Sequence, residues 1–216
     1  MNKQTLENFA AAGLLSAAFL IFTALVRCVD VQAIGPNGSR VGFAAVNGWF
    51  HALTGVHWTL YYLTDWLEFI SLGIAFCFGV VGLTQLIRRR SLWKVDASIL
   101  ILGGFYLLVI AAYLFFEMHA VNYRPVLIDG FLEASYPSST TLLVLCVLPT
   151  TMMQLRDRMP RSTSWTLVLW LLGAFTVFMV LARLMSGVHW LTDILGGILL
   201  SAALVLLYRA AVSATI

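Results

Sequence analysis

The chain has 216 residues, of which 61% are hydrophobic and 11% are charged, and its formal net charge is +3. Soluble domains carry roughly 25% charged residues, so this composition excludes an ordinary water-soluble fold and predicts a protein that lies in the lipid bilayer. The small net charge gives no reason to expect nucleic acid as a partner. No long polar insert separates the apolar runs, which favours a single domain.

Six apolar runs approach the ~20 residues that a helix needs to cross a bilayer. They predict an all-α, polytopic membrane protein with transmembrane helices at 9–26, 69–87, 98–116, 136–155, 165–184 and 190–211. The second helix could begin as early as Tyr61, which would bring Asp65 and Glu68 to its outer end.

Basic residues gather on one side of these predicted helices. Nine of the thirteen lie there: Lys3, Arg88, Arg89, Arg90, Lys94, Arg156, Arg158, Arg161 and Arg209. Because basic loops remain in the cytoplasm, we expect this side and both termini to be cytoplasmic. Seven of the ten acidic residues lie on the opposite side, namely Asp30, Asp65, Glu68, Glu117, Asp129, Glu133 and Asp193.

The first outer connection, at about 29–61, is the only long one. Its Gly-Pro-Asn-Gly stretch at 35–38 predicts a turn. Apolar residues at 43, 46, 49, 50 and 53 follow at helical spacing, which predicts a short helix at the membrane interface. The three cysteines lie inside apolar runs, so we expect neither a disulfide framework nor a zinc site.

The last outer segment combines Arg183, His189 and Asp193. His189 and Asp193 are four residues apart at the start of a helix, so their side chains share a face. The carboxylate can accept one imidazole N–H and leave the other nitrogen as a nucleophile or base. The guanidinium of Arg183 suits two phosphate oxygens. The alternative is a buried trio that only ties two helices together, but ionisable groups at membrane depth favour a functional site.

Two more outer segments carry polar groups. Pro125 ends the third predicted span and leaves Arg124 at the outer surface, where a lone arginine is more often an interfacial anchor. Tyr-Pro-Ser-Ser-Thr-Thr at 136–141 opens the fourth span as a capped helix start, and free N–H groups there can also bind an anion.

In order and spacing, these segments resemble the type 2 phosphatidic acid phosphatase family of lipid phosphatases, which is related in fold to the vanadium haloperoxidases. The family pattern runs Lys-x6-Arg-Pro, Pro-Ser-Gly-His and Ser-Arg-x5-His-x3-Asp. The third motif is matched at Arg183, His189 and Asp193, with Ala182 in place of its serine. The resemblance covers the last four spans, and it implies one membrane domain over 1–216 with a family-type bundle at about 60–212. Residues 1–59 would add an N-terminal span and the interfacial segment.

The resemblance implies that His189 takes the phosphoryl group and that Asp193 orients it. The phosphate would be held by Arg124, Arg183, Ser138 and Ser139. It further implies a hydrolase in the plasma membrane, which needs no cofactor and acts at the extracytoplasmic face. Its partner would be a lipid phosphate or diphosphate, such as phosphatidate or a polyprenyl diphosphate. With no divalent-metal cluster in the outer segments, we expect chemistry without a metal.

Two positions depart from the family pattern. Glu117 stands where the family has lysine, and Thr140 stands where it has the histidine that protonates the leaving group. General acid help is worth ~10²–10⁴-fold in rate. A diphosphate needs it less, since phosphate esters have a second pKa near ~6. Alternatively, Glu117 or His119 could act as the acid.

These departures leave two other functions open. The first is a lipid-phosphate binder or transporter without catalysis. The second is a phosphotransferase, in which an alcohol rather than water takes the phosphoryl group from His189. The oligomeric state is not predicted.

Overall fold

The computed structural model describes residues 3–160 and 162–215, so Arg161 of the predicted cytoplasmic cluster lies outside the described residues. Within the described residues the regular elements are all helical, which confirms the predicted all-α class. The helices are α1 (Lys3–Cys28), α2 (Ala44–Thr54), α3 (Trp58–Arg89), α4 (Ala97–Met118), α5 (Ser139–Arg158), α6 (Thr163–Met185) and α7 (Leu191–Ser213). Short 3₁₀ turns lie at Pro36–Gly38 and Leu92–Lys94.

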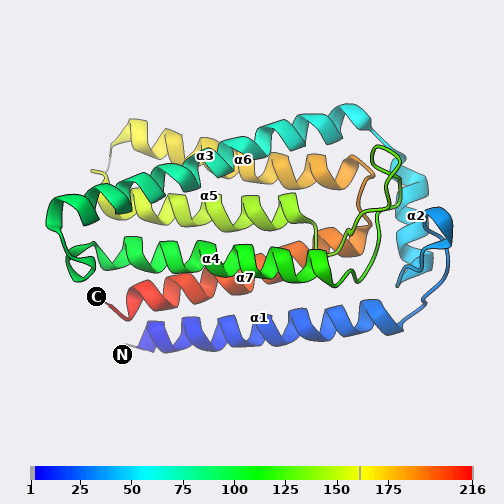
Figure 1. Ribbon diagram of the computed structural model, residues 1–216, viewed down its shortest axis with the longest axis horizontal. Helices are drawn as coiled ribbons and strands as arrows, with labels where there is room; N and C mark the ends of the chain where they lie inside the picture. Colours follow the sequence, from blue (N-terminus) through cyan, green and yellow to red (C-terminus); the bar gives the residue numbers. More distant parts are fainter. Residues whose placement is uncertain (1–2, 161, 216) are drawn as a thin grey trace.

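The long helices run side by side as a bundle, and α2 lies across one end of it (Figure 1). The helix α5 contacts α3, α4, α6 and α7, while α1 packs along α7. Five of the described helices, α1, α3, α4, α6 and α7, are long and apolar enough to cross a membrane. The chain is therefore a multi-pass membrane protein, and a count of six spans stays a prediction.

The helix α5 differs from the other long helices because protein surrounds it. Its interior includes Pro149, and the side chains of Thr150, Thr151 and Gln154 are buried. A helix that faces other helices can hold polar groups, which bond to their neighbours rather than to lipid. Gln154 Nε2, for example, donates a hydrogen bond to Tyr208 Oη on α7.

Two uncertain boundaries of the sequence are settled by the observed helices. The helix α3 begins at Trp58, so Asp65 and Glu68 lie near its first turns, as the earlier of the two predicted starts requires. The short helix expected around residues 43–53 is α2. The helix α5 begins at Ser139, after an extended stretch, and the Ser138 hydroxyl accepts a hydrogen bond from the Thr141 backbone N–H.

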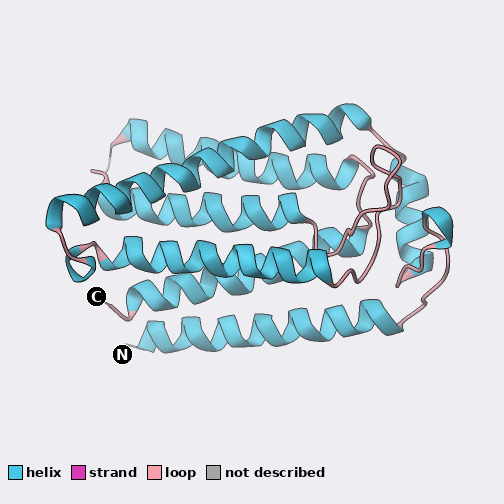
Figure 2. Cartoon of the chain, viewed as in Figure 1, coloured by secondary structure: helices cyan, strands magenta, loops and turns pink. Residues whose placement is uncertain are grey.

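The two ends of the bundle differ in chemistry. Both chain ends lie at one end (Figure 1), where Asp96 accepts hydrogen bonds from Arg89 at 2.8 Å and Arg158 at 3.0 Å. The pKa of Asp96 is lowered to about 2, mainly by the hydrogen bond from Arg89 and further by that from Arg158. The opposite end carries α2 and the irregular connections that precede α5 and α7 (Figure 2).

Candidate active site

His189 lies in the turn between α6 and α7, and only 2% of it is exposed. The turn depends on Gly187, which has a φ of +70° and whose Cβ, if present, would lie 1.9 Å from the Gly55 carbonyl oxygen. The ring Nδ1 lies 3.0 Å from Ser135 Oγ and 3.2 Å from the Ser135 carbonyl oxygen. The ring Nε2 is buried and has no hydrogen-bond partner among the described residues. An Nδ1–H that bonds to Ser135 leaves the lone pair on Nε2.

Asp193 holds the imidazole through Ser135. Its Oδ2 accepts hydrogen bonds from Ser135 Oγ at 2.5 Å and from the Trp190 backbone N–H at 2.9 Å. Its Oδ1 accepts one from Asn122 Nδ2 at 3.2 Å. The distance from Asp193 Oδ2 to His189 Nδ1 is 3.9 Å, which is too long for a hydrogen bond. The direct bond expected from the four-residue spacing is therefore replaced by a Ser135 bridge.

The segment before α5 carries this bridge because it folds back on itself. The Ser135 N–H donates to the Asn122 carbonyl, and the Arg124 N–H donates to the Glu133 carbonyl. The Ser138 N–H then donates to the Asp193 carbonyl at 3.0 Å, which joins the start of α5 to α7. As a result, the folded segment at 122–138 and the start of α7 meet at one site.

The two arginines lie beside His189, and each has donor groups without a hydrogen bond to any residue that the structure describes. Arg124 is 8% exposed; its Nε lies 3.1 Å from Glu133 Oε2, and its Nη1 has no partner among the described residues. Arg183 is 1% exposed, and its Nη1 donates to Thr64 Oγ1 at 3.1 Å. Its Nε is unpaired in the described structure. Buried donors without partners are rare in proteins, so both guanidinium groups suit an anion.

The helix α3 supplies the surroundings of Arg183. Asp65 Oδ1 lies 3.7 Å from Arg183 Nη1, and the guanidinium carbon lies 4.9 Å from the centre of the Tyr61 ring. The side chains of Tyr61, Thr64 and Asp65 therefore belong to the site, although none of them forms part of a motif that the sequence revealed.

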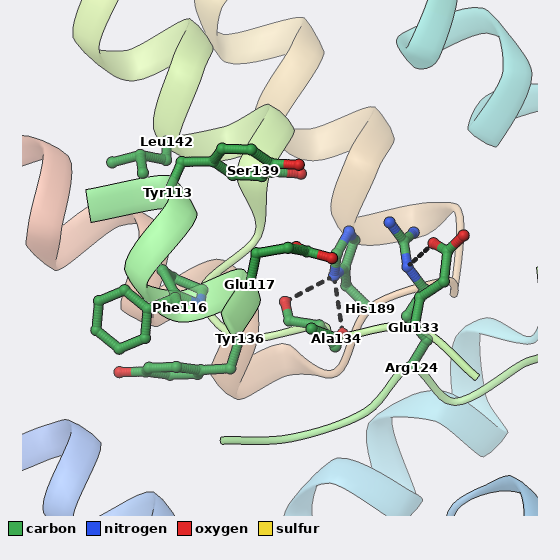
Figure 3. Close-up of a pocket in the computed structure, with 12 residues that line it drawn as sticks. Tyr113, Phe116, Glu117, Arg124, Glu133, Ala134, Tyr136, Ser139, Leu142 and His189 are labelled. Atoms are coloured by element: carbon green, nitrogen blue, oxygen red, sulfur yellow. Dashed lines mark hydrogen bonds and ion pairs between the residues drawn. The ribbon is translucent and has the colours of Figure 1, made fainter. Parts of the chain in front are cut away.

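A cavity of about 240 Å³ opens on His189, with Arg124, Glu117, Glu133 and Ser139 also in its lining (Figure 3). Figure 3 shows that Glu117 extends from the end of α4 into the cavity toward His189. Burial lowers the pKa of His189 well below its usual value, and the nearby charges of the two arginines lower it further. The imidazole is thus neutral at neutral pH, as a nucleophile must be.

Of the other residues predicted for the site, only some line the cavity. Ser139 lines the cavity, whereas the Ser138 hydroxyl accepts a hydrogen bond from Thr141 Oγ1 as part of the helix cap. Thr140 Oγ1 donates to Glu68 Oε2 at 2.7 Å. His119 is exposed at the end of α4, where its Nδ1 lies 2.9 Å from the Phe115 carbonyl oxygen, and it is not part of the cavity lining.

Sequence reasoning missed the bridging residues. Ser135 stands directly before the predicted 136–141 segment and Asn122 stands two residues before Arg124, but nothing in their local pattern marks them. Among the described residues, no group of three or more histidine, cysteine, aspartate or glutamate side chains is placed to hold a metal ion.

Comparisons with known proteins bear on the family and the fold of this chain. Residues 123–215 match the family model of the PAP2 superfamily. A solved structure from Bacillus subtilis, described as the first transmembrane PAP2 type phosphatidylglycerolphosphate phosphatase, has a TM-score of 0.53 and 22% identity to this chain. That comparison covers 95% of this chain and 96% of the other, and so shows a shared fold. None of the curated proteins compared gives a significant match. Residues 123–215 are thus similar to the PAP2 superfamily, and the multi-pass chain as a whole shares the fold of that membrane phosphatase.

Proposed function

We propose that this protein is a lipid phosphatase that hydrolyses a lipid phosphate or diphosphate through a phosphohistidine at His189. One observation carries the proposal: His189 Nε2 and Arg124 Nη1 are both buried, without a hydrogen-bond partner among the described residues, at one cavity of a PAP2-like fold. A phosphoryl group offers an electrophilic phosphorus to the imidazole and acceptor oxygens to the guanidinium.

The arrangement supports each part of the chemistry. His189 Nε2 attacks phosphorus, and positive charge then grows on the ring. The Ser135 and Asp193 relay holds the Nδ1–H and stabilises that charge. Arg124, Arg183 and the first N–H groups of α5 would balance the charge on the phosphoryl oxygens, which is the main catalytic requirement in phosphoryl transfer.

An apolar cavity beside the site supports a lipid substrate. It measures about 220 Å³ and lies between α3, α4 and α5, with Leu72, Val109 and Ile110 in its lining. It shares Tyr113 and Ser139 with the polar cavity. Largely apolar pockets with a few polar groups are typical ligand sites, and here an acyl or prenyl chain would leave its phosphate beside His189.

We place the reaction at the extracytoplasmic face of the plasma membrane. The site lies at the end of the bundle opposite the chain termini (Figure 1), and the positive-inside rule assigns the termini to the cytoplasm.

The test is phosphate release by purified protein from phosphatidate and from a polyprenyl diphosphate. His189→Ala should abolish release from both. His57→Ala is the matched control. The Gly-Val-His-Trp tetrapeptide that holds His189 at 187–190 occurs a second time at 55–58, where it holds His57. The Nε2 of His57 lies 2.9 Å from the Thr54 carbonyl oxygen, and His57 is not part of the cavity lining. Release should also survive chelation of divalent metals. Wild-type protein that is inert on both lipids would overturn the proposal.

A catalytically silent lipid-phosphate binder is the second candidate, and the carboxylates at the cavity favour it. Glu117 extends into the cavity and Glu133 pairs with Arg124, so a phosphate dianion would meet negative charge there. Retention of phosphatidate that depends on Arg124 and Arg183, without turnover, would support this candidate. In an active protein, a labelled product other than inorganic phosphate would indicate transfer to an alcohol.

A further inference from the structure

Glu68 is an acidic side chain that the family pattern does not include. It lies on α3, half-buried, and its Oε2 accepts a hydrogen bond from Thr140 Oγ1 at 2.7 Å. Thr140 occupies the position at which the resembled family has its leaving-group histidine. The Glu68 carboxyl group is therefore hydrogen-bonded to Thr140, the residue that stands in place of the family's acid histidine.

The face of α3 that carries Glu68 is also the face that contacts Arg183. Tyr61, Thr64 and Asp65 lie seven, four and three residues before Glu68, so the four side chains share one stripe of the helix. Thr64 and Asp65 contact the Arg183 guanidinium, and the Tyr61 ring lies against it. The register that brings these groups to Arg183 also brings Glu68 to the start of α5.

The position of Glu68 matches the side from which the leaving group departs. In phosphoryl transfer the attacking and leaving atoms lie roughly in line on opposite sides of phosphorus. The leaving oxygen carries the lipid chain, so it must face the apolar cavity. Glu68 lines that apolar cavity, whereas Glu117 and His189 line the polar one.

We propose that Glu68, held by Thr140, is the general acid for the leaving group, an assignment that rests on the proposed phosphatase function. As the bond from His189 Nε2 to phosphorus forms, the bond from phosphorus to the lipid oxygen breaks. That oxygen keeps the electron pair and takes the proton from Glu68. Water then attacks the phosphohistidine and gives a proton to the Glu68 carboxylate, which releases inorganic phosphate and restores both side chains.

The test compares two leaving groups in Glu68→Gln protein. Phosphatidate must release a basic alkoxide, so its kcat should fall ~10²–10⁴-fold, the usual value of general acid help. The p-nitrophenyl phosphate leaving group is a stable anion, so its hydrolysis should remain close to that of the wild type. Retained hydrolysis of this second substrate also shows that the variant is folded.

Glu117→Gln is the matched control and should not show the selective loss.

A pair of variants at Thr140 gives a second test. Thr140→Val should lose phosphatidate hydrolysis selectively, whereas Thr140→Ser should retain it, because serine keeps the hydroxyl that donates a hydrogen bond to Glu68. If Glu68→Gln is inert on both substrates, this Thr140 pair decides: equal activities of the two variants overturn the assignment. A selective loss in Glu117→Gln instead of Glu68→Gln also overturns it and leaves the phosphatase function intact. Wild-type protein that is inert on phosphatidate and on p-nitrophenyl phosphate overturns the Glu68 assignment, and inertness on the polyprenyl diphosphate as well overturns the phosphatase function.

Discussion

Ser135 determines how His189 is held, because its hydroxyl stands between the imidazole and the Asp193 carboxylate. Ser135→Ala would remove one of the two hydrogen-bond partners of the ring, leaving the Ser135 carbonyl, and would also remove one donor to a buried carboxylate. A buried polar group left without its partner costs ~1–3 kcal/mol, so we expect kcat on phosphatidate to fall by ~10–100-fold. The change should appear in kcat more than in KM, since Ser135 acts through His189.

Ser71→Ala is a suitable control for that substitution. Ser71 is fully buried on α3, and its hydroxyl has no hydrogen-bond partner among the described residues. The alanine variant should therefore keep wild-type kcat. Equal kcat values for Ser135→Ala and Ser71→Ala would show that the bridge has no part in the reaction.

The sequence could predict the residues that are fixed by short spacing, but not those fixed by packing. His189 and Asp193 lie within one turn of helix, so their common face follows from helix geometry alone. Ser135 reaches them only because its segment folds back onto Asn122. The role of Glu68 likewise depends on how α3 is aligned with α5, which no local pattern specifies.

At the scale of helices, the crossing of α7 with α5 and the segment that precedes α5 depends on close approaches at Gly196 and Gly197. A Cβ at Gly196 would lie 2.5 Å from the Tyr136 ring, and one at Gly197 would lie 3.1 Å from the Thr141 side chain. Gly196→Ala should therefore displace the buried Tyr136 ring from α7, at the ~1–3 kcal/mol that overpacking costs. We expect a lower Tm in detergent and a loss of activity, because the Ser138 to Asp193 backbone bond spans this crossing.

Gly104 provides the control at this scale. It also lies within a long helix, α4, but a Cβ added there would meet nothing within 4 Å. Alanine is favoured over glycine in helices by ~0.8–1 kcal/mol, so Gly104→Ala should leave Tm unchanged or raise it. A Gly196→Ala protein as stable as Gly104→Ala would contradict the close-packed crossing.

Apolar runs predicted the long helices well where a helix faces lipid, and less well where it faces protein. The start of α3 was ambiguous because aromatic and acidic residues from Tyr61 to Glu68 interrupt the apolar run. Tyr61 and Asp65 are accommodated by contact with Arg183, and Glu68 by its hydrogen bond from Thr140, whereas Tyr62 and Trp66 are exposed. The central helix α5 carries buried threonines and Gln154 for a similar reason.

At the scale of the whole molecule, the bundle separates the end that carries the proposed site around His189, here called the catalytic end, from a basic end. At the basic end, Asp96 links three helices. It lies at the start of α4 and accepts hydrogen bonds from Arg89 of α3 and Arg158 of α5. The catalytic end is joined by the contacts around Asp193. Basic residues therefore hold the helix ends together, and by the positive-inside rule the same residues are expected to orient the chain in the membrane.

This separation predicts how the chain is labelled in intact cells. Cys28, exposed at the end of α1 near the catalytic end, should react with a membrane-impermeant maleimide, and Cys28→Ser should remove that label. Trp93 is 96% exposed in the turn between α3 and α4, at the basic end. In the Cys28→Ser background, Trp93→Cys should be labelled only after the cells are permeabilised. The opposite labelling pattern would place the basic end outside, and it would move the proposed reaction to the cytoplasmic face.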